Sequence, residues 1–347
     1  MSLKDIYAPY FKIGTSVNKD NMESDEAKAE LRKHYNSITA ENGMKPMHMM
    51  DWKENLENPK QYHDHAALNF SIARKYLGFA RESGIPVRGH TLVWHNQTPL
   101  WFFKEEYSMD EEAPLASRET MLVRMENYIR DVLTFVQTEY PGVIYAWDVV
   151  NEAIEEREQE GWRHRSPWYK TVGEDFVLQA FRLARKYADP QVKLFYNDYN
   201  TFNPFKRDAI TDLILKPLMA EKLVDGMGMQ THLVLDDRIW PEYEKSLQHY
   251  GSLGLEIQIT ELDIHNPDPS EAGEQKLAEA YERLFTILTN AKKEQKINLT
   301  TVTFWGMKDD ESWLTEFRKE QSYPMLFGDN YLQKAAYYAV VRVAQKQ

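Results

Sequence analysis

The feature that most constrains the fold is a regular alternation, along the whole chain, between short apolar runs and longer amphipathic stretches. Eight runs rich in β-branched or apolar residues have the length and composition of buried strands. They are Phe11–Val17, Ser37–Ala40, Val87–Leu92, Tyr145–Val150, Lys193–Tyr196, Met227–Thr231, Glu256–Thr260 and Thr301–Trp305. Because parallel strands need crossover helices, eight such units predict an α/β protein with a single (β/α)8 barrel.

Helical periodicity lies between these runs. Two apolar stripes recur at spacings of three and four residues, which places each on one face of a helix. They are Leu122, Met125, Ile129, Val132 and Val136, and Leu277, Tyr281, Leu284, Leu288 and Ala291. A third helix is predicted over Asn69–Ser83, ended by Gly84, with Pro86 just beyond. An open doubly wound sheet is the alternative, but Phe11–Thr15 carries no Gly-rich phosphate loop.

Composition and charge indicate the number of domains, exclude some classes of binding partner and favour one cellular compartment. No Pro/Gly/Ser-rich linker, charge block or short repeat interrupts the sequence, so we expect one continuous domain over residues 1–347. Asp and Glu number 54 against 42 Lys and Arg, which argues against nucleic acid or an anionic membrane as partner. No apolar run approaches the roughly 18 residues that span a bilayer, and Met1–Asp5 does not continue into a secretory signal. Since the absence of cysteine agrees with a reducing compartment, we expect a cytoplasmic protein.

Polar residues gather where the predicted strands end, which is where barrels of this kind carry their chemistry. They are Glu41, Asn42, Lys45, His90, Trp94, His95, Asp148, Asn151, Glu152, Gln230, His232, Glu261, Asp263 and Trp305. Glu152 and Glu261 follow the fourth and seventh strands, so we expect them to face each other with carboxyl groups about 5–5.5 Å apart. Such a pair can cleave a glycosidic bond, with one carboxylic acid protonating the leaving oxygen and one carboxylate attacking the anomeric carbon. The plainer alternative, a buried ion pair for each glutamate, explains two such residues among many polar neighbours less well.

The histidines raise a competing hypothesis of a divalent-metal site. His90, His95 and His232 with Asp148 or Asp263 provide the residue types of such a site. However, His90 and His95 are separated by an apolar segment, and their run contains no His-x-His pair. We therefore expect no metal and no other cofactor.

Five aromatic residues are expected on the loops of the same barrel face. They are Trp94, Trp101, Tyr199, Trp305 and Trp313. Flat apolar rings with polar rims suit the C–H faces of sugars, whose hydroxyls then reach amides and charges. Any one of these residues can instead belong to the core, but as a set they favour a carbohydrate cleft.

Four ordered motifs resemble the signature segments of glycoside hydrolase family 10, the retaining endo-β-1,4-xylanases. They are Glu41–Pro46 (ENGMKP), Gly89–His95 (GHTLVWH), Trp147–Ala153 (WDVVNEA) and Thr260–Asp263 (TELD). The resemblance runs nearly end to end, from Phe11 to Trp313. It is more specific than an isolated Asn-Glu pair, which many barrel glycosidases share.

The resemblance implies a role for each residue of the site. Glu152 is implied as general acid/base and Glu261 as nucleophile, with Asn151 bonding the 2-hydroxyl of the sugar under attack. His232, oriented by Asp263, would hold Glu261 in position, with Gln230 beside them. The implied binding residues are Glu41, Asn42, Lys45, His90 and Trp94 on the glycone side, Trp305 and Trp313 as walls that leave little space for a C6 hydroxymethyl group, and Tyr199 as the aglycone-side stacking residue.

The resemblance also implies a xylan fragment or xylo-oligosaccharide as substrate. With no module after the barrel and no visible export signal, the chain is similar to the intracellular members that trim imported oligosaccharides. Two alternatives stay open. One is a β-glucosidase or cellulase on the same barrel, and the other is a carbohydrate-binding protein that has lost catalysis.

Overall fold

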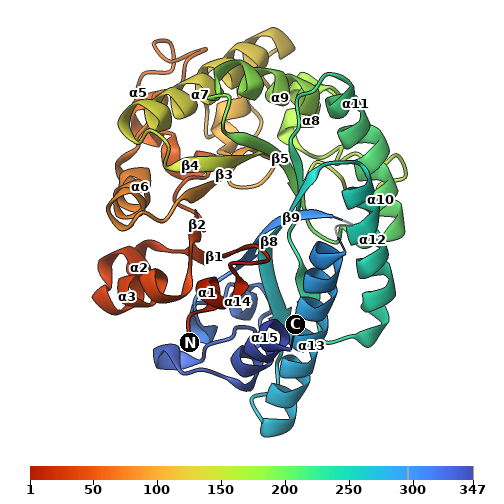
Figure 1. Ribbon diagram of the computed structural model, residues 1–347. Helices are drawn as coiled ribbons and strands as arrows, with labels where there is room; N and C mark the ends of the chain where they lie inside the picture. The colour runs from red at the N-terminus through yellow and green to blue at the C-terminus, as the bar shows by residue number, and fades with distance from the viewer. Residues whose placement is uncertain (295–296, 347) are drawn as a thin grey trace. The chain divides into compact units, whose positions relative to one another are not determined.

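The computed structural model describes residues 1–294 and 297–346 (Figure 1). The chain divides into two compact units. The first unit holds residues 1–39, 199–207 and 227–347, and the second holds residues 40–198 and 208–226. Within the described residues each of the eight predicted apolar runs forms a strand, although some ends differ by a few residues. The sixth strand ends at Met229, two residues earlier than predicted, and an additional short strand follows at His232–Val234.

Parallel strands form the centre of the first unit, in the order β1, β9, β8, β7. The strands that lie wholly or mainly in this unit are β1 (Lys12–Val17), β2 (Ser37–Ala40), β6 (Gly226–Met229), β7 (His232–Val234), β8 (Glu256–His265) and β9 (Asn298–Phe304). Thr231 separates β6 from β7 because its φ of 66° is left-handed and interrupts an extended strand. The register of β7 on β8 places His232 opposite Asp263.

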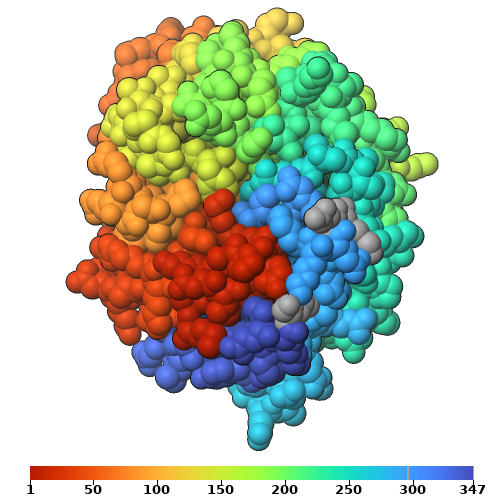
Figure 2. All heavy atoms as spheres, viewed as in Figure 1, coloured from red at the N-terminus to blue at the C-terminus, as the bar shows by residue number. Residues whose placement is uncertain are grey.

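The helices of this unit lie before, between and after these strands along the chain. They are α1 (Leu3–Tyr7), α2 (Lys19–Glu23), α3 (Asp25–His34), α10 (Pro204–Ala209), η3 (Asp237–Ile239), α12 (Trp240–Ser252), α13 (Glu271–Lys293), η4 (Asp309–Glu311), α14 (Leu314–Arg318), η5 (Asp329–Tyr331) and α15 (Ala335–Gln345). The predicted stripe from Leu277 to Ala291 is buried along α13. The red N-terminal and dark blue C-terminal residues adjoin in Figure 2. One contact between them is the hydrogen bond from Tyr7 Oη to the carbonyl of Val340 at 2.6 Å.

Three neighbouring parallel strands form the centre of the second unit: β3 (Val87–Trp94), β4 (Ile144–Asn151) and β5 (Lys193–Asp198). Nearly every residue in them is buried, as expected for a parallel sheet covered on both faces. The helices of this unit are α4 (Pro46–Met49), α5 (Trp52–Glu57), α6 (Ser71–Ser83), η1 (Leu100–Phe103), α7 (Arg118–Glu139), α8 (Pro167–Val172), α9 (Phe176–Tyr187), the π-helical η2 (Ile210–Leu215) and α11 (Lys216–Ala220).

The helix predicted over Asn69–Ser83 begins two residues later than expected. The side chain of Asn69 accepts the backbone N–H of Ser71 at 3.0 Å, which holds the chain in a turn ahead of α6. The helix ends as predicted at Gly84, whose φ of 69° is left-handed. In α7 the predicted stripe is buried from Met125 to Val136, whereas its first residue, Leu122, is only partly buried.

Adding a methyl group at two glycines of the second unit should change the stability of the protein in opposite directions. A Cβ on Gly89 would lie 2.4 Å from the ring of Trp147, whereas a Cβ on Gly78 inside α6 would meet nothing within 4 Å. We expect Gly89→Ala to lower the free energy of unfolding by about 3 kcal/mol, because the added methyl group overpacks the core. We expect Gly78→Ala to raise the free energy of unfolding by about 0.5–1 kcal/mol, because alanine favours the helix more than glycine does. Calorimetric melting midpoints should therefore fall for the first variant and rise for the second, and a shift in the same direction would contradict this account.

Candidate active site

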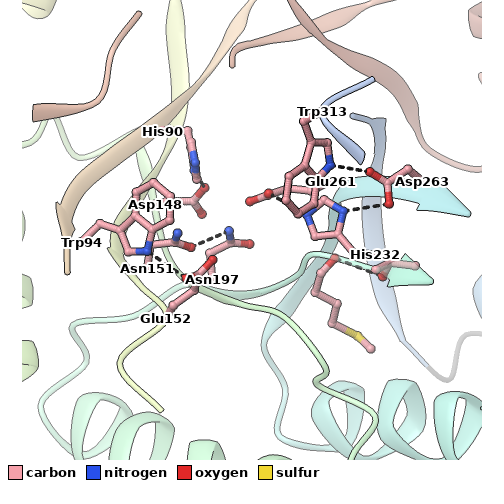
Figure 3. Close-up of polar contacts among 12 residues, drawn as sticks. His90, Trp94, Asp148, Asn151, Glu152, Asn197, His232, Glu261, Asp263 and Trp313 are labelled. Atoms are coloured by element: carbon pink, nitrogen blue, oxygen red, sulfur yellow. Dashed lines mark hydrogen bonds and ion pairs between the residues drawn. The ribbon is translucent and has the colours of Figure 1, made fainter. Parts of the chain in front are cut away.

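Glu152 follows β4 directly and has a left-handed backbone, with φ of 57°. Trp94, the last residue of β3, donates from its indole Nε1 to Glu152 Oε2 at 2.9 Å (Figure 3). The carboxyl group of Glu152 is thus held by a neutral aromatic donor. Both residues lie at the carboxyl ends of their strands, where the sequence predicts the chemistry.

Asn151 is bonded to its neighbour on β5. Asn197 Nδ2 donates to Asn151 Oδ1 at 2.9 Å, and both side chains are buried. The contact engages the acceptor end of the Asn151 amide and so assigns its donor, Nδ2, to the opposite side of the side chain.

A buried ionic network lies beside these residues. Arg88 binds both carboxylate oxygens of Asp148, and His90 Nδ1 lies 2.8 Å from Asp148 Oδ2. Asp148 and Arg88 are almost fully buried, so each charge stabilises the other where water does not reach. The arrangement fixes the orientation of the His90 ring through Asp148.

In the segment that follows β2, Lys45 contacts both Asn42 and Trp94. Lys45 donates from Nζ to Asn42 Oδ1 at 2.9 Å, and its ammonium lies 4.9 Å from the centroid of the Trp94 ring. Glu41 is half-buried and directly follows the last residue of β2. His95 packs edge-on against Trp94, with ring centroids 5.9 Å apart.

In the first unit, His232 bridges two carboxylates. Its Nε2 lies 3.1 Å from Glu261 Oε2 and its Nδ1 lies 2.9 Å from Asp263 Oδ1 (Figure 3). Burial would lower the pKa of His232, but the negative charges and hydrogen bonds of Asp263 and Glu261 outweigh it and raise the pKa to about 10. The ring is therefore cationic at neutral pH and donates to both carboxylates, so that Glu261 is paired with a positive charge.

Two tryptophan rings lie beside His232. Trp313 donates from Nε1 to Asp263 Oδ2 at 2.9 Å and packs edge-on against His232, with ring centroids 4.9 Å apart. The Trp305 ring lies 6.5 Å from that of His232. Gln230 is buried, and its carbonyl accepts the backbone N–H of Glu261 at 2.9 Å.

Tyr199 and Trp101 have different surroundings. Lys206, which is fully buried, places its Nζ 3.2 Å from the centroid of the Tyr199 ring. Trp101 lies in η1, is buried, and packs edge-on against Tyr107 at 5.2 Å. Of the five aromatic residues expected at the cleft, Trp101 therefore packs as a core residue.

The comparison with protein families decides the class of this site. The sequence matches the profile described as glycosyl hydrolase family 10 over residues 2–343. The chain belongs to this family. Its fold is accordingly the α/β fold with a closed barrel of eight parallel strands, which confirms the predicted (β/α)8 architecture.

Several family 10 proteins are similar over nearly the whole chain. Endo-1,4-beta-xylanase B of Butyrivibrio fibrisolvens is 52% identical over 344 residues, which cover 99% of this chain and 53% of that protein. This chain thus spans about half the length of that relative. A solved Clostridium thermocellum xylanase with bound xylohexaose is 36% identical with a TM-score of 0.89, covering 99% of this chain and 67% of the other. A mutant of an intracellular Thermoanaerobacterium saccharolyticum xylanase with xylotriose is 34% identical with a TM-score of 0.84, covering 98% of each chain.

The side chains that the metal hypothesis combined contact one another and other protein groups. Among residues 1–294 and 297–346, no group of three or more His, Asp or Glu side chains is placed to hold a metal ion. Of the residues that the metal hypothesis combined, His90 binds Asp148, and Asp148 also binds Arg88. In the same part of the family 10 chain, no helix has the length and hydropathy needed to cross a bilayer.

Sequence reasoning missed two residues of this family 10 site. Asn197 is the next-to-last residue of β5 and lies in register with Asn151, the last residue of β4, so the strand-end criterion applies to it as well. Arg88 is a charged residue inside an apolar run, and such a residue requires a buried partner of opposite charge. That signal points to a carboxylate on a neighbouring strand, which is Asp148.

The charged state of His232 predicts a pH-dependent stability. Its pKa is about 10 in the folded protein and about 6.5 as a free side chain. The charged ring of His232 therefore adds its full contribution to the free energy of unfolding below about pH 6.5. This contribution declines as the pH rises and is lost above about pH 10. We expect His232→Asn to lower the free energy of unfolding by a few kcal/mol at pH 6 and by almost nothing at pH 10.5. Urea unfolding of both proteins at several pH values measures this difference, and a constant difference would contradict the assignment.

Proposed function

We propose that this family 10 chain is a retaining endo-β-1,4-xylanase acting on xylan fragments and xylo-oligosaccharides. The observation that carries the proposal is the different setting of the two glutamates. Glu261 is paired with the cationic ring of His232, which favours a carboxylate and suits a nucleophile. Glu152 accepts a hydrogen bond from the neutral indole N–H of Trp94, and we assign it the role of general acid/base. The names of the relatives and their bound xylo-oligosaccharides support the choice of sugar.

In the first step, the Glu261 carboxylate attacks the anomeric carbon and the glycosidic C–O bond breaks. Glu152 gives its proton to the leaving oxygen, so the departing sugar leaves as an alcohol and a covalent xylosyl-enzyme forms on Glu261. We propose that the two carboxyl groups lie about 5–5.5 Å apart, because that separation leaves no place for a water molecule between nucleophile and acid.

In the second step, Glu152 acts as a base. Its carboxylate takes a proton from water, whose oxygen attacks the anomeric carbon while the bond to Glu261 breaks. Two inversions restore the β configuration, and both glutamates return to their starting protonation states.

The remaining residues bind the sugar in this proposal. Asn151 donates to the 2-hydroxyl of the sugar under attack, and Gln230 supports Glu261 through its backbone. Glycone-side contacts come from Glu41, Asn42, Lys45, His90 and Trp94. Trp305 and Trp313 form walls against a C6 hydroxymethyl group, and Tyr199 stacks on the aglycone side. Xylose lacks the C6 hydroxymethyl group, whereas glucose carries it.

Hydrolysis of matched oligosaccharides tests the proposed substrate. We expect kcat/KM for xylotetraose to exceed that for cellotetraose by at least about tenfold, because the tryptophan walls oppose the extra hydroxymethyl groups. Product chromatography should show cleavage inside the xylotetraose chain, and EDTA should leave the rate unchanged. A preference for cellotetraose supports the glucosidase or cellulase alternative, a loss of activity with EDTA supports a metal enzyme, and binding without turnover supports a binding protein.

We further propose that the enzyme is cytoplasmic and that residues 1–347 form one catalytic domain. The similarity to the intracellular Thermoanaerobacterium saccharolyticum xylanase supports the location, and the family match over residues 2–343 supports the single domain. Fractionation of producing cells tests the location, because the activity should accompany a cytosolic marker enzyme.

A further inference from the structure

Arg163 contacts the backbone of Glu152, although nothing in the sequence pattern placed it in the site. Its Nε donates to the carbonyl of Glu152 at 3.0 Å, and its Nη2 donates to the carbonyl of Ile154 at 3.4 Å. Its Nη1 forms an ion pair with Glu155 Oε2 at 2.7 Å. The side chains of Arg163 and Glu155 are only 14% and 11% exposed. The guanidinium is thus held by three contacts in a setting that water reaches poorly.

A tight hairpin after β4 brings Arg163 back to Glu152. Ile154 and Trp162 form an antiparallel bridge. The N–H of Arg163 donates to the carbonyl of Ala153 at 3.0 Å, and the N–H of Glu155 donates to the carbonyl of Gly161 at 2.8 Å. These bonds fix the base of the Arg163 side chain independently of its guanidinium contacts.

The backbone of Glu152 is in a conformation that needs such support. Its φ of 57° lies in the left-handed region, which carries a steric cost for a residue with a Cβ. On one side β5 holds this turn, because Asn197 accepts the N–H of Glu152 and Tyr196 Oη accepts the N–H of Ala153, both at 2.9 Å. Arg163 holds the carbonyl of Glu152, so these contacts together secure both peptide groups that flank its Cα.

We propose that Arg163, anchored by Glu155, is a positioning residue that keeps the carboxyl group of Glu152 aimed at the leaving oxygen. The inference rests on the proposed role of Glu152 as general acid/base. Proton transfer requires heavy atoms about 2.6–3.2 Å apart, and a misplacement of about 1 Å costs about 100-fold in rate. Arg163 acts through the backbone of Glu152, so its loss affects the reactions that need the proton of Glu152.

Arg163→Lys tests the proposal, because lysine keeps the charge but lacks the fork of donors that binds two carbonyls and a carboxylate together. We expect kcat/KM for xylotetraose to fall by about 10–100-fold. We expect kcat/KM for dinitrophenyl β-xylobioside to fall by less than about threefold, because that leaving group departs without a proton. Glu155→Gln should give a smaller loss with the same dependence on the leaving group.

Arg185→Lys is the matched control. Arg185 also joins a carboxylate and a carbonyl, those of Asp225 and Leu223, at 2.7 and 2.9 Å. Asp225 binds the N–H of Leu194 near the start of β5, the opposite end of the strands from Glu152. Any change in this control should be equal for the two substrates.

Two results distinguish the inference from the proposed function. If Glu152→Ala shows the leaving-group dependence but Arg163→Lys and Glu155→Gln affect both substrates equally or not at all, the positioning role of Arg163 is overturned. If the wild type fails to cleave xylotetraose, or Glu152→Ala lacks that dependence, the proposed function itself is overturned.

Discussion

Glu261→Ala reduces kcat/KM for xylotetraose by at least about 10⁴-fold in our account, because the variant has no nucleophile for the first step. The loss in kcat/KM should be similar for good and poor leaving groups, since every substrate needs the attack on the anomeric carbon. Steady-state kinetics with xylotetraose and dinitrophenyl β-xylobioside measure both effects.

The control for this variant lies on the same strand. Glu256→Gln changes a glutamate at the start of β8, where its carboxylate accepts from Gln258 at 3.0 Å. We expect a change of less than about tenfold, because this residue lies at the end of the strand opposite the proposed chemistry. Equal losses for Glu256→Gln and Glu261→Ala would show that any disturbance of β8 abolishes activity and would contradict a special role for Glu261.

Azide adds a stereochemical test of Glu261→Ala. A small anion in the space left by the carboxylate attacks the anomeric carbon from the same face, while Glu152 still protonates the leaving oxygen. One inversion converts a β-xyloside into an α-xylosyl azide, which NMR identifies through the anomeric coupling constant. A β-azide from this variant would contradict the nucleophile assignment.

Glu152→Ala should lower kcat/KM for xylotetraose by about 10²–10⁴-fold, the usual range for a general acid. For dinitrophenyl β-xylobioside, kcat/KM should fall by less than about tenfold, because the leaving group needs no proton. Its kcat should still fall, because the second step lacks a base and the xylosyl-enzyme accumulates. A rapid burst of dinitrophenolate followed by slow turnover would show this accumulation.

Azide and a surface variant complete the test of Glu152. With Glu152→Ala, azide attacks the xylosyl-enzyme in place of water and gives a β-xylosyl azide, the opposite configuration from the Glu261 variant. Glu160→Ala, on the exposed loop after β4, should behave as wild type. Equal losses on activated and unactivated substrates would remove Glu152 from the acid role.

The strands were predictable because buried parallel strands require short apolar runs, and each such run in this chain became a strand. Local backbone details were less accessible. The left-handed Thr231 separates the sixth strand, β6, from the additional strand β7, and the Asn69 turn delays the start of α6. Both depend on single backbone or side-chain conformations that hydrophobic periodicity does not report.

The site residues were predictable to the extent that strand ends and motifs identify them. His232, Glu261 and Asp263 come together as expected because β7 and β8 are in register. Arg163 was not predictable, because its contact with Glu152 arises only when the loop after β4 closes as a hairpin. Core packing likewise decided Trp101, whose ring contacts Tyr107.

Trapping of the covalent intermediate tests the central claim most directly. In a 2-deoxy-2-fluoro-xylobioside with a dinitrophenyl leaving group, the fluorine slows both steps and the leaving group speeds the first, so the glycosyl-enzyme accumulates. Mass spectrometry of the intact protein should show one added fluoroxylobiosyl group, and peptide mapping should place it on Glu261. Attachment to any other side chain, or no adduct together with products of inverted configuration, would contradict the account.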